Sequence, residues 1–106
     1  MENLKIIPNK SKAGSVLLEF EESITLSNVS ELKIELLDVL EKYEHFELSS
    51  QPINQIDLSG IQLIIAFAKS VERQGKSLQL NLKWSAEMQE LIKKTGFWEV
   101  LNKSEK

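Results

Sequence analysis

The 106-residue chain contains no cysteine, and this absence excludes several kinds of chemistry at once. Without thiols the chain forms no disulfide, has no thiolate nucleophile and offers no sulfur ligand to zinc. Histidine is almost absent too: the only one is His45, and the sequence places no partner for an acid–base pair or a metal beside it. We therefore interpret His45 as a residue at a strand end, and expect no metal site and no cofactor.

Basic residues and long apolar runs are also scarce. Lysine and arginine together number 13 against 16 acidic residues, which gives a net charge of −3, and nucleic-acid binding needs clustered basic residues. The longest apolar run, Leu63–Ala68, is far shorter than the ~20 residues that span a bilayer. The first ten residues lack a secretory signal. We expect a cytoplasmic protein that neither binds nucleic acid nor inserts into a membrane.

Signatures of catalysis are missing as well. The four glycines fit turns or helix ends, and none forms a loop that would hold a phosphate. No nucleophile has a base at a useful spacing, and the acidic residues fall mostly on helix surfaces. We therefore expect a protein without enzymatic activity.

What the sequence does contain is an alternation of strand and helix patterns, which predicts a single α/β domain over residues 1–106. Alternating apolar residues predict these strands: Leu4–Ile7, Ser15–Phe20, Ser23–Leu26, His45–Ser49, Ile53–Ile56 and Ser77–Leu82. Helices are predicted from Ser27, Asn28 or Ser30 to Tyr43, from the Asp57–Gly60 stretch to Gly75, and from Ser85 to Gly96. Because each helix has one apolar face, the helices should cover the sheet mainly on one side.

The outer helices have predictable buried faces. In the first helix these are Val29, Leu32, Leu36, Val39, Leu40 and Tyr43. Ile34 lies on the opposite side, where it is either exposed to solvent or part of a contact surface. In the third helix they are Met88, Leu91, Ile92 and Thr95. The segment Phe97–Leu101 is expected to fold back onto the body as a terminal clamp.

The rest of the chain is organised around Pro52–Gly75, where a short strand runs directly into a helix. Asp57 and Ser59 suit the first turn, because their side-chain oxygens can accept from free backbone N–H groups. Ser59 and Gln62 also have the spacing of a capping box. On a helical wheel, Ile61, Ile64, Ile65, Ala68 and Val71 form a buried face. Opposite them runs a ridge of small or apolar residues, namely Ser59, Leu63, Ala66 and Ser70, which are either simply exposed or contact a partner.

The stretch Asp57-Leu58-Ser59-Gly60, followed by Ile61-Gln62-Leu63, resembles the Asp-Ser-Ser-Gly-Leu joint of STAS domains, the fold of anti-sigma-factor antagonists. The resemblance covers about Ser15 to Leu101. It implies a mixed β-sheet of about four to five strands with helices mainly on one face. In phosphorylated members of the family, the hydroxyl residue directly after the aspartate accepts phosphate from a partner kinase. Here that position is Leu58, and Ser59 is the only possible phosphoacceptor in the joint.

The resemblance implies a non-enzymatic signalling adaptor, of the type found with chemotaxis systems, whose partner is a kinase, a receptor or an anti-sigma-type regulator. The expected partner-binding residues are Asp57, Leu58, Ser59, Gly60, Gln62, Leu63, Ala66 and Ser70. Two alternatives remain open: an anti-sigma-factor antagonist regulated by phosphorylation of Ser59, and an accessory subunit of a membrane lipid or anion transporter. Since a capping Ser59 would face its own backbone beside the Asp57 charge, we expect binding that does not depend on phosphorylation.

Overall fold

The main sheet has four strands in the order β1-β2-β4-β6. The structure, a computed structural model, describes residues 4–96. The strands are β1 (Leu4–Pro8), β2 (Ser15–Phe20), β4 (His45–Ser50) and β6 (Ser77–Asn81). β1 and β2 form an antiparallel hairpin, whereas β2, β4 and β6 are mutually parallel, so the sheet is mixed.

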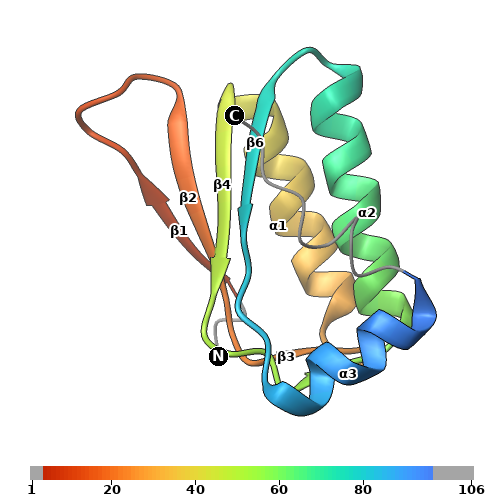
Figure 1. The fold of residues 1–106 in the computed structure, drawn as a ribbon. Coiled ribbons are helices and arrows are strands. Elements are labelled where there is room, and N and C mark those ends of the chain that lie inside the picture. Colours follow the sequence, from red (N-terminus) through yellow and green to blue (C-terminus); the bar gives the residue numbers. More distant parts are fainter. Residues whose placement is uncertain (1–3, 97–106) are drawn as a thin grey trace.

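Within residues 4–96, two helices cover one face of this sheet and no helix covers the other (Figure 1). The helices are α1 (Val29–Lys42) and α2 (Leu58–Arg73), each of which connects two parallel strands. Alternate strand residues are buried beneath them: Val16, Leu18, Phe20, Phe46, Leu48, Leu78 and Leu80. The residues between these point to the face that no described helix covers. The predicted α/β class, with a mixed sheet and helices mainly on one side, is confirmed.

The helix faces agree with the wheel for α1 but only partly for α3 (Ala86–Thr95). Within α1, Leu32, Leu36, Val39 and Leu40 are buried, while Ile34 is 69% exposed. In α3 only Ile92 is fully buried, Met88 is half-buried, and the prediction for Leu91 and Thr95 was wrong because both are exposed. The reason is the position of α3, which lies across one end of the described fold (Figure 1), and Ile92 is its one fully buried residue.

The short predicted strands do not join the main sheet. β3 (Ser23–Ile24) and β5 (Gln55–Ile56) pair in parallel as a separate two-stranded sheet. Beside them Ile53 forms an isolated bridge with Trp84. This small sheet lies at the carboxyl end of the parallel strands, next to α3 and the start of α2 (Figure 1). The predicted clamp at Phe97–Leu101 lies outside the described residues.

No helix within residues 4–96 is long and apolar enough to cross a membrane.

Candidate functional site

The start of α2 is held by the carboxylate of Asp57, the N-cap residue. Its Oδ1 accepts from the Gly60 N–H at 3.1 Å and from the Ser59 hydroxyl at 2.6 Å. Its Oδ2 accepts from the backbone N–H of Leu26 at 2.9 Å, which joins α2 to the segment after β3. The Ser59 hydroxyl, followed by the Leu26 N–H, stabilises the charged form and lowers the pKa of Asp57 below 3.8. The Asp57 carboxylate thus accepts hydrogen bonds from Leu26, Ser59 and Gly60.

The predicted capping box at Ser59 and Gln62 was wrong. Asp57 is the extended residue immediately before the helix, so its side chain, not that of Ser59, reaches the free N–H groups of the first turn. Ser59 lies inside the helix, half-buried, and its hydroxyl donates to the Asp57 carboxylate instead of facing its own backbone.

Gly60 allows α2 to lie directly against the small sheet. It is buried, and a Cβ atom at this position would lie 2.3 Å from the carbonyl oxygen of Ile24 and 2.8 Å from Cγ1 of Ile56. The same Ile24 carbonyl accepts from the Asp57 N–H at 3.4 Å. The backbone of the helix therefore approaches β3 more closely than any side chain would permit.

The predicted ridge on α2 also needs correction, because Leu63 belongs to the core. It is 9% exposed, and Phe67, one turn later, is buried as well. The buried arc is wider than the wheel suggested because α2 packs against both the sheet and α1. Of the other ridge residues, Ala66 is exposed, whereas Ser59 and Ser70 are half-buried.

Three exposed leucines surround the joint and form what we call the leucine patch: Leu26, Leu58 and Leu91, which are 74%, 58% and 54% exposed. Leu58 and Leu91 line an apolar hollow of about 210 Å³ between α2 and α3. The hollow is completed by Ile56, Asp57, Ile61, Met88, Ile92 and Thr95. Leu26 does not line the hollow, but its backbone N–H donates to Asp57, which does.

Sequence reasoning missed Leu26 and took Leu91 for a core residue. The three leucines are 32 and 33 positions apart, so no local pattern connects them. The only available signal was that Leu26 directly precedes the cluster of N-cap residues at the start of α1.

The chemistry available at the joint is limited to one hydroxyl–carboxylate pair, Ser59 and Asp57. Within residues 4–96, no three histidine or acidic side chains are grouped as a metal site would require. The geometry is instead that of a rigid helix start beside exposed apolar side chains.

Comparison with known proteins agrees with this architecture. The family model described as "Mlab, STAS domain" matches residues 9–102. The chain belongs to the STAS domain family. Two solved structures are similar to this STAS domain. One is the anti-sigma factor antagonist SpoIIAA in its unphosphorylated form: the TM-score is 0.67 and the identity 11%, with 90% of this chain and 82% of that chain covered.

The second is the Bacillus cell fate determinant SpoIIAA in the phosphorylated form, with a TM-score of 0.66 and 11% identity, covering 97% of this chain and 91% of that chain. At this identity the likeness shows the fold. No curated protein matches the sequence.

The structure brings most of the predicted site residues of this STAS domain together. Asp57, Leu58, Ser59 and Gly60 form the joint, and Gln62 is exposed one turn along α2. Ala66 and Ser70 follow further along the helix, away from the leucine patch, while Leu63 faces the core. The candidate site is therefore the joint with the leucine patch, not the ridge along α2.

Proposed function

We propose that this STAS domain is a non-enzymatic cytoplasmic signalling adaptor that binds a partner protein with the leucine patch and the start of α2. The observation that supports this is the patch itself: three leucines, each more than half exposed, beside an apolar hollow. Exposed apolar side chains that gather beside polar ones are typical of protein-binding sites. The hollow would receive an apolar anchor of the partner, the kind of contact that contributes most to binding energy.

The architecture of the joint suits this role because contacts within the chain hold the patch in place. Asp57 ties Leu26 to the first turn of α2, and Gly60 fixes the helix on the small sheet. A surface that is already ordered loses little conformational entropy when a partner binds. The partner class we propose is a kinase, a receptor or an anti-sigma-type regulator.

The test compares Leu58→Glu and Leu91→Glu with a matched control. Ile34→Glu makes the same kind of change at an exposed apolar residue on α1 that does not line the hollow. Affinity capture from the source cell identifies the partner, and the dissociation constant is then measured with both purified proteins. Loss of a central apolar anchor should weaken binding by about tenfold or more. All three variants should keep the circular dichroism and melting temperature of the wild type.

An equal loss of affinity in Ile34→Glu, or none in the two patch variants, would contradict the proposed surface.

A second candidate is a phosphorylation-regulated antagonist that uses Ser59, and one contact favours it. The Ser59 Oγ lies 2.6 Å from the Asp57 Oδ1, so a carboxylate is already placed to accept the hydroxyl proton. Against it, a phosphate on Ser59 would break this hydrogen bond and put about two negative charges beside Asp57. We therefore propose binding that does not depend on phosphorylation. Intact-mass analysis of protein from its native cell, in growth and under stress, should show no phosphate; stoichiometric phosphate mapped to Ser59 would favour the antagonist instead.

A further inference from the structure

A second hollow, of about 340 Å³, lies at the end of the sheet opposite to the joint. It spans the amino ends of the three parallel strands and is bordered by the turn between β1 and β2. Ser15, His45 and Ser77 are paired directly across these strands and form one row. Their neighbours Val16, Phe46 and Leu78 are buried under the helices, so the row points to the face that no described helix covers.

Ser15 gives the first sign of a ligand, because its hydroxyl has no hydrogen-bond partner among the described residues. The residue is 8% exposed, and no described group hydrogen-bonds to its Oγ. An unsatisfied buried hydroxyl is costly, so it should gain a partner where one can be supplied. The turn lies directly against it: Asn9 N–H donates to the Ser15 carbonyl, and Ser15 N–H donates to the Lys12 carbonyl.

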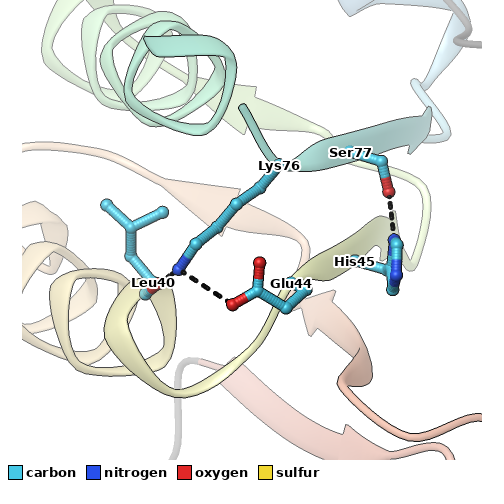
Figure 2. A network of polar contacts seen from close by, with 5 residues as sticks. All are labelled: Leu40, Glu44, His45, Lys76 and Ser77. Carbon is cyan, nitrogen blue, oxygen red and sulfur yellow. Dashed lines mark hydrogen bonds and ion pairs between the residues drawn. The ribbon is translucent and has the colours of Figure 1, made fainter. Parts of the chain in front are cut away.

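The other two members of the row supply a further donor. Figure 2 shows His45 and Ser77 pointing toward each other, with 2.7 Å between Nδ1 and Oγ. If Nδ1 accepts, the neutral ring carries its proton on Nε2; if Nδ1 donates, the Ser77 hydroxyl keeps its own proton free. In either tautomer the pair retains one donor for a ligand.

The turn adds a cation and an amide. Lys12 lines the hollow and carries the positive charge, and Asn9 lines it beside Lys12. The Oδ1 of Asn9 already accepts from the N–H and the hydroxyl of Ser11, which leaves the amide N–H₂ as the free part of that side chain. Three separate segments therefore direct hydrogen-bond donors at one hollow.

One carboxylate also lines the hollow, and a hydrogen bond directs it away from the row. Asn81 Nδ2 donates to Glu47 Oε2 at 2.8 Å. Asn81 is paired with Ser49, which lies two residues beyond Glu47 along β4, farther from His45. This bond therefore draws the carboxylate toward the carboxyl end of the strand, away from the donors.

From this arrangement we propose that the hollow is a binding site for the carboxylate or phosphate group of a small metabolite, held by Lys12, Ser15 and the His45–Ser77 pair. Its volume is at the lower end of the range of about 300–1,000 Å³ typical of ligand pockets, which selects a small molecule. Because the Ser15 hydroxyl is enclosed, the turn shifts when the anion enters. The site is separate from the leucine patch and gives the domain a small-molecule input in addition to its protein partner.

The test is a titration of the full ¹⁵N-labelled chain with sodium phosphate and with sodium acetate, at constant ionic strength maintained with sodium chloride. Saturable shifts are expected at the amides of residues 9–17, 45–47 and 77–79, with the joint at 57–62 unchanged. Lys12→Gln should weaken binding about tenfold. Ser15→Ala should weaken it about fivefold while the domain stays folded, because the change removes a hydroxyl that has no partner within residues 4–96.

Lys10→Gln is the matched control, since Lys10 belongs to the same turn and is exposed but does not line the hollow. The affinity of the Lys10→Gln variant for the anion should stay within about twofold of the wild type, because this charge makes no contact with the ligand. Equal losses in the Lys10 and Lys12 variants would show that the anion is attracted non-specifically by the positive charge of the turn, and would overturn the proposal. So would shifts that do not saturate with either anion, or shifts centred on the joint.

Discussion

The substitution Gly60→Ala tests the central feature of the joint, the direct contact between the α2 backbone and β3. Alanine adds a single Cβ atom, and in the native geometry this atom would lie 2.3 Å from the Ile24 carbonyl oxygen. It would also lie 2.8 Å and 2.9 Å from side-chain carbons of Ile56 and Ile24. Distances below 3.0 Å cannot persist, so α2 must move away from the small sheet or β3 must shift.

The loss of stability depends on how easily the atoms around the added Cβ can move away. Overpacking a well-packed core costs about 1–3 kcal/mol, and more where the obstacle is backbone rather than a flexible side chain. Because the nearest atom here is a backbone oxygen that also accepts from the Asp57 N–H, we expect about 3 kcal/mol or more. Alanine's better helix propensity offsets only about 1 kcal/mol of this. The net loss should lower the melting temperature by roughly 10 °C in a domain of this size.

The assay is urea unfolding followed by circular dichroism, together with thermal melting. Gly75→Ala is the control, since nothing lies within 4 Å of an added Cβ there and its only cost is a φ of +72°. That backbone strain should cost about 1–2 kcal/mol. A Gly60→Ala variant as stable as wild type would refute the reasoning, because it would mean that α2 does not approach β3 as closely as described.

Three further changes test other contacts. Leu63→Glu should unfold the domain or destabilise it by about 3 kcal/mol or more, because a charge would enter the core at a position only 9% exposed. An unchanged melting temperature would mean that Leu63 lies on the surface. Lys76→Met should lower the free energy of unfolding by about 1–2 kcal/mol, because the Lys76 ammonium donates to the Leu40 carbonyl at the end of α1 (Figure 2). The ion pair between Lys76 Nζ and the exposed Glu44 carboxylate, at 3.9 Å, adds little. The change in the urea midpoint measures the loss. Asp57→Asn should remove a pH-dependent contribution to the stability of the domain. Because the pKa of Asp57 is lower in the folded protein than in the unfolded chain, its carboxylate stabilises the fold above pH 3.8, and this stabilisation is lost as the pH falls through the pKa of the folded state. Melting curves at pH 7 and pH 3 should therefore show a wild-type advantage at pH 7 that shrinks at pH 3, and an equal difference at both pH values would contradict this.

The sequence predicted the elements of this fold well because their signals are local. The faces of α1 and the strand alternation in β2 and β6 each follow from periodicity within a few residues. The order of the strands and the separate pairing of β3 with β5 depend on contacts between distant segments, and no short pattern encodes them.

The candidate site was predictable in part, for the same physical reason. Asp57 and Ser59 were both expected in the first turn. Ser59 lies there, whereas Asp57 is the cap residue just before it, because the extended backbone ends at Asp57. The burial of Leu63 depends on how much of α2 its neighbours cover, and the exposure of Leu91 on how little of α3 the core covers. Periodicity gives the centre of a buried face, whereas the width of that face is set by tertiary packing.

The leucine patch combines side chains from three stretches of the chain, two of which are joined by the hydrogen bond from the Leu26 N–H to Asp57. An excised peptide covering residues 52–75 would carry Leu58 alone and could not reproduce the surface. An antibody or designed binder raised against the patch would recognise a discontinuous epitope and would bind only folded molecules. Such a reagent would measure the native fraction of this domain inside a cell, and would compete with any partner that occupies the same leucines.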